Sequence, residues 1–269
     1  MPCYRDHVLM DEGAESAMRG SGLQDRELVR VGDTVRRPYG PFTASVHHLL
    51  RHLRANGFDL APEPRGVDEA GQEILSFIEG RDQGWPMLPE ILRLEGSARL
   101  GELSSRLRSA LASYECPPTA RWQFAAGAPG PGEAMQHGDL GPWNLLWGED
   151  GQVVGILDWD FAQPGDPMYD TGYLAWFSVP LLDDDRARAR GFPAPPDRLA
   201  RLDAFAAGAG LTRAQVLEAA LATQAEYEHR VISRRRAGGS WTLFYQRGFH
   251  KNAARDRRWT VSQFGQILR

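Results

Sequence analysis

Lysine is almost absent from this sequence of 269 residues: Lys251 is the single lysine among 31 basic residues, and the others are arginines. A site that ordinarily uses a lysine must therefore use an arginine here, unless Lys251 serves it. Cysteine is scarce as well. Cys3 and Cys116 lack the spacing of metal ligands and a neighbouring catalytic histidine pattern. We expect two free thiols, which suits a reducing cytoplasm.

Long apolar runs and a large charge imbalance are also missing. No stretch approaches the roughly 20 apolar residues that a membrane helix needs, and the N-terminal residues mix charges where a secretory signal would be apolar. The 31 basic residues nearly balance 35 acidic ones, so the chain lacks the overall field that nucleic-acid or membrane binders use. We expect a soluble, cytoplasmic protein that binds neither nucleic acid nor membrane.

The first 80 residues have the pattern of a small α+β lobe. Two short β-type runs flank Gly32 and Asp33 in "ELVRVGDTVRRP", which indicates a tight hairpin. Apolar residues recur at helical spacing in "TASVHHLLRHLRANG", with Gly57 as the stop signal. The compact apolar run "EILSFIEG" then predicts a strand. Hairpin, helix and strand together predict a lobe that ends near residue 80.

Helical periodicity dominates the rest of the chain. Apolar residues from Leu100 to Tyr114 follow a period of 3.6 residues, whereas "PTARWQFAAGAPGPGEA" is typical of a loop. Further helices are expected after Asp166 and in "PPDRLARLDAFAAGAG", and Thr212 with Gln215 has the form of a capping box before a long helix. The predicted fold class is α+β, with a small β-rich lobe over residues 1–80 and a larger, mainly helical lobe over residues 81–269.

The polar groups that suggest chemistry gather in "MQHGDLGPWNLLWGEDGQVVGILDWDFAQPGDPMYD", which begins at Met135. Asp139 and Asn144 lie five residues apart, with Gly141 and Pro142 between them. That composition disfavours a regular helix and allows a tight loop, so both side chains could face the same space. The loop therefore offers one carboxylate and one amide close together.

A second acidic group follows an apolar run. Val153, Val154, Ile156 and Leu157 predict a buried strand, which ends in Asp158. Carboxylate and amide oxygens are the protein ligands that Mg²⁺ prefers, and phosphoryl transfer needs such an ion together with a carboxylate to position the hydroxyl. Asp160, two residues later, could be a second metal ligand or support the first. Asp, Asn, Gly and Pro are also ordinary loop residues, so the strand and the second acidic cluster carry this interpretation.

The motif pair "HGDLGPWNLLW" and "GILDWDFAQPGDPMYD" resembles the aminoglycoside phosphotransferase family, antibiotic kinases with a two-lobed, protein-kinase-like fold. The resemblance implies that Asp139 is the catalytic carboxylate that orients the acceptor hydroxyl. It also implies that Asn144 and Asp158 ligate Mg²⁺ and that Asp170 is a structural carboxylate at a helix start. His137 is expected to brace the loop by hydrogen bonding, with a direct catalytic role as the alternative.

The same resemblance implies ATP as the phosphoryl donor, with GTP possible. Residues 1–80 would form the nucleotide-binding lobe, and residues 81–269 the catalytic and substrate-binding lobe. Adenine is expected to bond to backbone near Ser76, Phe77 and Ile78, and the glycines in "RGSGLQDRE" are a weak candidate for a loop over the phosphates.

The phosphate-binding side chain departs from the family pattern. In such kinases a lysine on the third strand grips the phosphates and is held by a glutamate on the next helix, but here the strand reads "TVRRP". Arg36 and Arg37 point to opposite faces of a strand, so one of them can take this role, and we favour Arg36 slightly. The alternative is that both are solvated. No acid lies in the helix, where Val46 stands beside His47 and His48, so either a histidine substitutes or the arginine acts unaided.

The acceptor is expected to be a small hydroxylated molecule, an aminoglycoside or another antibiotic. Acids in the helical lobe could bind a cationic acceptor, although solvated helix faces are the alternative, and Trp143 could stack on a ring or pack in the core. The acidic candidates are Asp183, Asp184 and Glu226. The main rival function is a catalytically weak or inactive kinase-like immunity or binding protein that sequesters a small molecule or peptide. Whether the protein is a monomer or a homodimer stays open.

Overall fold

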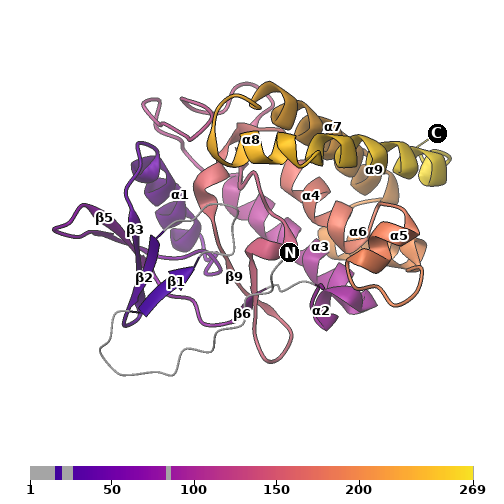
Figure 1. Cartoon of the computed structure of the whole chain (residues 1–269), viewed down its shortest axis with the longest axis horizontal. Helices are drawn as coiled ribbons and strands as arrows, with labels where there is room; N and C mark the ends of the chain where they lie inside the picture. The colour runs from indigo at the N-terminus through magenta and orange to yellow at the C-terminus, as the bar shows by residue number, and fades with distance from the viewer. Residues whose placement is uncertain (1–15, 20–26, 83–85, 269) are drawn as a thin grey trace. The chain divides into compact units, whose positions relative to one another are not determined.

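The computed structural model describes residues 16–19, 27–82 and 86–268, and shows an α+β protein (Figure 1). The chain forms two compact units that each draw on several stretches of sequence. The first unit comprises residues 1–84, 109–139 and 143–165, and the second comprises residues 85–108, 140–142 and 166–269. The first change of unit falls after residue 84, close to the boundary expected near residue 80, but residues 109–139 and 143–165 also group with the first unit.

A five-stranded antiparallel sheet forms the beginning of the first unit. Its strand order is β1-β2-β3-β5-β4. The strands are β1 (Ser16–Arg19), β2 (Glu27–Val31), β3 (Thr34–Pro38), β4 (Pro64–Val67) and β5 (Gln72–Ser76). The predicted hairpin at Gly32 and Asp33 is confirmed, and Gly32 has the positive φ of 60° that such a turn requires. The glycines of "RGSGLQDRE" fall on residues 20–26, outside the described ranges.

Helix α1 (Thr43–Ala55) follows the hairpin, as its apolar spacing predicts. Val46, Leu49, Leu50 and Leu53 on one face of the helix are at most 1% exposed. Burying four large apolar side chains stabilises such a helix far more than propensity does, at about 1.5–3 kcal/mol for each side chain. Gly57, with φ of 75°, lies just beyond the helix end.

Two small antiparallel sheets complete the first unit. One contains β6 (Arg81–Asp82), β8 (Leu145–Trp147) and β9 (Val153–Ile156), and the other pairs β7 (Ala134–Gln136) with β10 (Gln163–Gly165). The strand expected at Val153 is confirmed. Since β7 leads into residue 137 and β8 follows residue 144, these pairings hold the loop that contains Asp139 beside the segment that contains Asp158.

The second unit is helical. Helix α7 lies against both α4 and α9 (Figure 1). The helices are α2 (Pro89–Leu92), α3 (Leu94–Leu111), α4 (Tyr169–Ser178), α5 (Asp184–Ala189), α6 (Arg198–Ala209), α7 (Arg213–Ser233), α8 (Gly239–Gln246) and α9 (Phe249–Phe264). The capping box predicted from Thr212 and Gln215 is present at the start of α7. Within the described ranges, no helix has the length and apolarity needed to cross a membrane.

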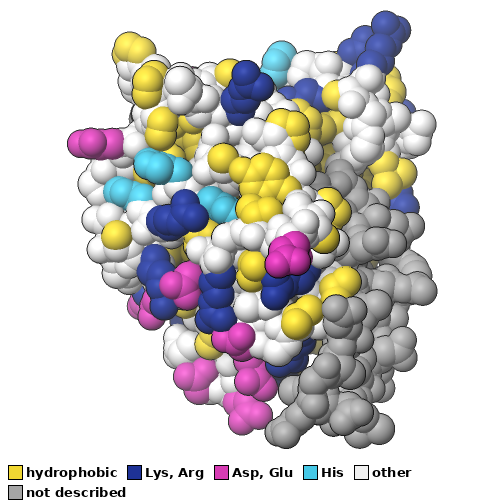
Figure 2. Space-filling model, turned by 90° about the vertical axis from the view of Figure 1, so that its left-hand side faces the viewer, with side chains coloured by type: hydrophobic (Ala, Val, Ile, Leu, Met, Phe, Trp, Pro, Cys, Tyr) yellow, Lys and Arg dark blue, Asp and Glu magenta, His cyan; other side chains and the backbone are white. Residues whose placement is uncertain are grey.

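The surface in Figure 2 mixes charges of both signs. In its lower half, basic and acidic side chains lie next to one another, while histidine and hydrophobic side chains gather above them. Intermixed charges of this kind produce only short-range fields that salt screens within about 8 Å. Charge of neither sign dominates this face.

Close packing of α4 on α7 depends on Gly172. A Cβ atom at this position would approach the carbonyl group of Ala219 and the hydroxyl of Thr223 to well under 3.0 Å. The same Thr223 hydroxyl donates to the carbonyl oxygen of Tyr169 at 2.9 Å, so it is not free to move aside. The two helices can approach this closely because the residue has no side chain.

We therefore expect Gly172→Ala to lower the free energy of unfolding by about 1–3 kcal/mol, the usual cost of overpacking a buried contact. Gly130→Ala is the matched control, because a Cβ atom there would meet its nearest neighbour, Glu133, at 3.4 Å, an ordinary contact. Urea denaturation measures both. Equal stability of the two variants would contradict the close packing.

Candidate functional site

His137 holds the beginning of the loop in place. Its side chain is fully buried, and its ring lies 4.6 Å from the ring of Trp159, centroid to centroid. Nε2 lies 2.9 Å from the carbonyl oxygen of Leu157, and Nδ1 lies 3.3 Å from the backbone nitrogen of Asp139. A neutral imidazole satisfies both contacts if Nε2 donates and Nδ1 accepts. This geometry matches the expected bracing role.

Gly138 lets the loop pass close to the second acidic segment. Its φ is 84°, in the region that favours glycine, and a Cβ atom would clash with the carbonyl oxygen of Phe161. Both the backbone conformation and the contact therefore require glycine between His137 and Asp139. The loop and the segment that follows Asp158 lie backbone to backbone at this point.

Asp139 and Asn144 are in direct contact. Asn144 Nδ2 donates to the carbonyl oxygen of Asp139 at 2.8 Å and to its carboxylate Oδ2 at 3.1 Å. The short 3₁₀ helix η1 (Pro142–Asn144) makes this possible, because it turns the chain back within five residues. The indole Nε1 of Trp143 also donates to Oδ2, at 3.2 Å. Trp143, for which ring stacking or core packing was expected, thus contacts the carboxylate itself.

Asp158 is joined to this pair through its neighbour in the chain. The backbone N–H of Leu157 donates to the carbonyl oxygen of Asn144 at 2.8 Å, continuing the β8–β9 ladder by one residue. Asp158 follows in a left-handed conformation, with φ of 56° and ψ of 65°, while its side chain is exposed. Among the described residues it is the only one besides glycine with a positive φ. Such strain costs about 1–3 kcal/mol and is concentrated at functional sites.

The donor set fits Mg²⁺ better than a transition metal. In the described part of the chain, no three His, Cys, Asp or Glu side chains converge as a metal-binding group. Mg²⁺ does not need such a group, because proteins often hold it with one or two side chains, substrate phosphates and water. Because Nδ2 of Asn144 is directed at Asp139, the amide oxygen of Asn144 is the atom suited to a metal. The carboxylate of Asp158 is the second such group.

Arg37, rather than the slightly favoured Arg36, lies beside the second acidic segment. Its Nη2 is 2.9 Å from Asp160 Oδ1, and its Nε is 2.6 Å from Glu73 Oε1. The β3–β5 register explains the difference, because it places Arg37 opposite Glu73 and Arg36 opposite Ile74. Arg36 instead pairs with Asp68 at 3.7 Å. The expectation that the two arginines point to opposite faces is correct, and Arg37 rather than Arg36 is the one that lies beside Asp160.

Arg37 interacts with Glu73 as an ion pair rather than through a well-aligned hydrogen bond. Its Nε–H does not form a well-aligned hydrogen bond with Glu73, although the ion-pair distance is short. Asp160 is only 2% exposed and pairs with this arginine, an arrangement that suits the supporting role expected as the alternative to a second metal ligand. A guanidinium with several donors can keep one such contact while another donor turns to a phosphate.

Glu73 is the functional candidate that sequence reasoning missed. The search for a partner acid covered the helix, whereas Glu73 is on β5 and is 1% exposed. His47 Nε2, on α1, lies 2.8 Å from Glu73 Oε2, so a histidine does take the helix position, but it acts through a strand glutamate. A charged residue between apolar ones in "QEILS" was the available signal, since buried charges are almost always paired.

Some of the backbone groups at the end of β5 that were expected to contact the nucleotide already form hydrogen bonds within the first unit. The backbone N–H of Ser76 donates to Glu63 at 2.9 Å, and that of Phe77 donates to Asp33 at 2.8 Å. Those two groups are thus not free to bond a base as the structure stands. Ile78 packs closely against the backbone at Gly155, where a Cβ atom would lie 2.9 Å from its methyl carbon. The expectation of backbone contacts near Ser76, Phe77 and Ile78 otherwise stays a prediction.

The acids expected to bind a cationic acceptor are engaged in ion pairs within the second unit. Asp183 caps α5 and pairs with Arg255 at 2.9 Å, Asp184 pairs with Arg198 at 2.8 Å, and Glu226 pairs with Arg230 at 2.8 Å. A cationic guest would have to compete with these arginines for the three carboxylates. Asp170 is buried in the first turn of α4, where a carboxylate is electrostatically favourable.

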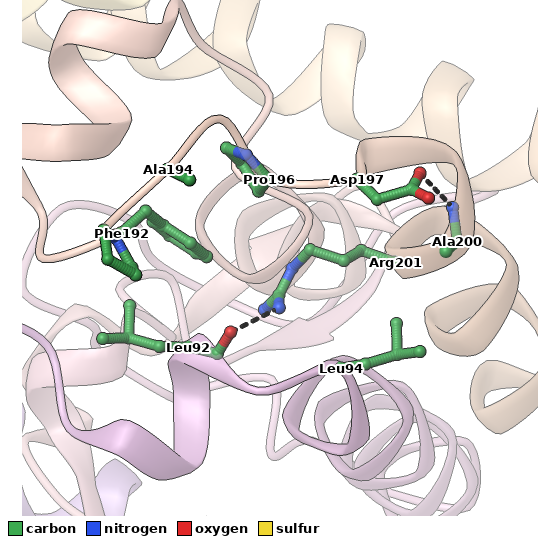
Figure 3. A pocket seen from close by; sticks show the side chains of 9 residues that line it. Leu92, Leu94, Phe192, Ala194, Pro196, Asp197, Ala200 and Arg201 are labelled. Carbon is green, nitrogen blue, oxygen red and sulfur yellow. Dashed lines mark hydrogen bonds between the residues drawn. The ribbon is translucent and has the colours of Figure 1, made fainter.

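A cavity of about 320 Å³ in the second unit contains none of the predicted site residues (Figure 3). Arg201 reaches from α6 across this cavity, and its guanidinium donates to four carbonyl oxygens, at 2.6–3.0 Å. These belong to Ile91, Leu92, Arg93 and Ser178. Burial lowers the pKa of Arg201 to about 10. The arginine thereby satisfies carbonyl groups at helix ends, which is a structural role.

Family membership follows from the sequence. Residues 89–205 match the model of the phosphotransferase enzyme family. The trifolitoxin immunity protein of Rhizobium leguminosarum bv. trifolii is 35% identical over 192 residues, which cover 70% of this chain and 72% of that protein. The chain belongs to the phosphotransferase enzyme family. The predicted relationship to the aminoglycoside phosphotransferases is thereby confirmed at the level of the family.

Solved structures confirm the fold predicted for this family member. A choline/ethanolamine kinase family protein from Mesorhizobium loti superposes with a TM-score of 0.54 at 17% identity, over 92% of each chain. An aminoglycoside phosphotransferase from Streptomyces rimosus, solved with ADP and streptomycin, gives a TM-score of 0.50 at 13% identity, over 78% of this chain and 91% of that one. At such identities the likeness shows the protein-kinase-like fold.

In this phosphotransferase-family protein, the ion pairs of Arg37 should stabilise the first unit. We expect Arg37→Met to lower the free energy of unfolding by about 3 kcal/mol or more, because it leaves the carboxylates of Glu73 and Asp160 buried without that cation. Arg36→Met, whose pair with Asp68 is longer and more exposed, should cost less than about 1 kcal/mol. Urea denaturation at neutral pH compares them. A smaller loss in Arg37→Met than in Arg36→Met would contradict the assignment.

Proposed function

We propose that the protein is an ATP- and Mg²⁺-dependent O-phosphotransferase that phosphorylates a hydroxyl group of a small molecule, an aminoglycoside or another antibiotic. The observation that carries this proposal is the direct contact of Asn144 with Asp139, joined through Leu157 to Asp158. One carboxylate for the hydroxyl and two oxygen donors for a metal then lie on adjacent segments, which is what phosphoryl transfer requires.

Each residue has a distinct part in the proposed reaction. Asp139 would orient the acceptor hydroxyl and take its proton as the oxygen bonds to the γ-phosphorus and the bond to the β-phosphate oxygen breaks. Asn144 and Asp158 would hold Mg²⁺, which when bound neutralises charge on the phosphates. Arg37 would bind phosphate through a guanidinium that Glu73 and Asp160 orient. The family resemblance implies ATP as the phosphoryl donor, with GTP as an alternative.

An arginine in the phosphate-binding position suits a chain with a single lysine. Its charge does not depend on a partner to stay protonated, and it offers paired donors to phosphate oxygens. Lys251, the other candidate cation, is exposed on α9 in the second unit. These properties support Arg37 as the side chain that replaces the usual lysine.

The rival proposal is an immunity or binding protein with little or no turnover. The trifolitoxin immunity protein, 35% identical, is the specific observation in its favour. The ion pairs of Arg37 with two carboxylates are compatible with it, because an arginine held in this way could be structural. A phosphotransferase can also confer immunity by modifying its target, so the two proposals differ in whether ATP is consumed.

A screen of hydroxylated antibiotics and metabolites separates these proposals. The purified protein is incubated with ATP, Mg²⁺ and each compound, and ATP consumption is followed by mass detection of an added phosphate. At least one phosphorylated product is expected. Binding of nucleotide or of a compound, without ATP consumption across a broad panel, would favour the binding protein.

We expect Asp139→Ala to lower turnover by two or more orders of magnitude while nucleotide affinity changes little, because this carboxylate acts on the acceptor rather than on the nucleotide. General-base catalysis by a positioned side chain typically contributes about 10²–10⁴-fold. Asp150→Ala, in the exposed turn between β8 and β9, is the matched control and should keep full activity. Turnover of Asp139→Ala equal to that of the control would defeat the assignment.

Asp158→Asn should weaken binding of the Mg²⁺–nucleotide complex by about tenfold or more, because it removes a charged ligand while asparagine tolerates the left-handed backbone. Calorimetric titration with a non-hydrolysable ATP analogue, with and without Mg²⁺, measures this effect. The loss should appear only in the presence of Mg²⁺. An equal loss with and without the ion would show that Asp158 does not act through a metal.

A further inference from the structure

The indole of Trp143 makes a contact that packing alone does not require. Its Nε1–H donates to Oδ2 of Asp139 at 3.2 Å, and Nδ2 of Asn144 donates to the same oxygen at 3.1 Å. Both donors lie in η1, which follows the carboxylate in the chain. Two N–H groups from one turn thus converge on one oxygen of the proposed catalytic carboxylate.

This arrangement distinguishes the two oxygens of Asp139. An N–H group can only donate, so two donors at Oδ2 fix the rotation of the carboxylate and draw negative charge toward that atom. Oδ1 is then the oxygen suited to receive the proton of an acceptor hydroxyl. A carboxylate that rotated freely would present either oxygen and would lose the alignment on which positioned proton transfer depends.

Asn144 alone could not hold the carboxylate reliably during the proposed reaction. Its amide oxygen is the atom suited to the metal, so any shift of the side chain toward an ion would pull Nδ2 away from Oδ2. Trp143 has no group that ligates Mg²⁺, and its contact with Asp139 is therefore independent of the metal. A second donor of this kind would keep Oδ2 in place while Asn144 serves the ion.

Trp147 shows that an indole in this part of the fold does not need a hydrogen bond. It is fully buried in β8, and its Nε1 has no hydrogen-bond partner among the described residues. Trp143 is only half-buried, and its N–H could therefore have been satisfied by solvent, yet it is directed at a carboxylate. The direction of the N–H, rather than the bulk of the ring, is thus the unexplained feature of Trp143.

We infer that Trp143 is a positioning residue for phosphoryl transfer, whose indole N–H holds Oδ2 of Asp139 so that Oδ1 faces the acceptor hydroxyl. This inference rests on the proposed phosphotransferase function. It assigns to Trp143 a role in turnover and none in nucleotide binding, because its contact is with the carboxylate that acts on the acceptor.

The test removes the N–H and keeps an aromatic ring. With an acceptor found in the screen, Trp143→Phe should lower kcat about ten- to hundredfold, the usual effect of losing a hydrogen bond to a charged group, with KM for ATP within about twofold of wild type. Trp147→Phe, which removes an N–H that donates to no described group, should leave both constants unchanged. If that buried variant does not fold, Trp259→Phe on α9 replaces it as the control.

A spectroscopic measurement tests the contact without activity. Trp143→Phe assigns the indole N–H resonance of Trp143 in the NMR spectrum, and Asp139→Ala should then shift that resonance upfield. The indole of Trp176, which donates to Asp256 at 3.0 Å in the second unit, should not respond. A Trp143 resonance that ignores Asp139→Ala would overturn the inference.

The two kinetic failures are distinguishable. If the wild-type protein consumes no ATP with any acceptor, the proposed function fails, and this inference fails with it. If the wild type is active and Trp143→Phe has the same kcat, the inference alone is overturned. This holds even if the indole N–H resonance of Trp143 shifts in Asp139→Ala. A large rise in KM for ATP with unchanged kcat would also overturn it, since that result assigns Trp143 to nucleotide binding.

Discussion

The candidate site depends on two backbone groups of Leu157, its N–H and its carbonyl oxygen. The N–H of Leu157 donates to Asn144, and its carbonyl oxygen lies within hydrogen-bond distance of His137 Nε2. One residue thereby links both ends of the loop around Asp139 to the segment between β9 and Asp158. Buried hydrogen bonds of this kind contribute modestly when formed, but leaving one group unpaired costs about 1–3 kcal/mol. The arrangement is therefore well determined, and the strained backbone of Asp158 is held by it.

The electrostatics of the first unit follow from a change of residue types. In the proposed assignment, Arg37 takes the phosphate-binding role that the family resemblance gives to a lysine, and its partner acid, Glu73, comes from β5 instead of the helix. His47 occupies the helix position and contacts Glu73, so helix, strand and arginine remain connected through an additional side chain. Because burial makes unpaired charges costly, removing any one of Arg37, Glu73 and Asp160 is expected to destabilise the others.

The sequence predicted the parts of this protein that local rules determine. The hairpin at Gly32, the helix from Thr43 and the capping box at Thr212 follow from turn, periodicity and capping preferences, and each is present. The contact of Asp139 with Asn144 was also predictable, because Gly141 and Pro142 between them restrict the chain to a tight turn.

Other features depend on how distant segments meet. The choice between Arg36 and Arg37 is set by the β3–β5 register, and alternation along one strand gives no information about which face is inward. Glu73 is 36 residues from Arg37 in the chain, so no local pattern connects them. Asp183 and Asp184 similarly have arginine partners that only the folded helices bring near, whereas Glu226 pairs with Arg230 one turn away on the same helix.

The central claim is that Asn144 and Asp158 together hold a metal beside Asp139. A crystal structure with Mn²⁺ in place of Mg²⁺ and a non-hydrolysable ATP analogue tests it most directly, because the anomalous signal locates the ion without reference to the protein atoms. The account predicts one anomalous peak within about 2.3 Å of the amide oxygen of Asn144 and a carboxylate oxygen of Asp158, with the phosphates on its other side. An ordered nucleotide with the ion bound elsewhere, or with no ion at these two side chains, would contradict it.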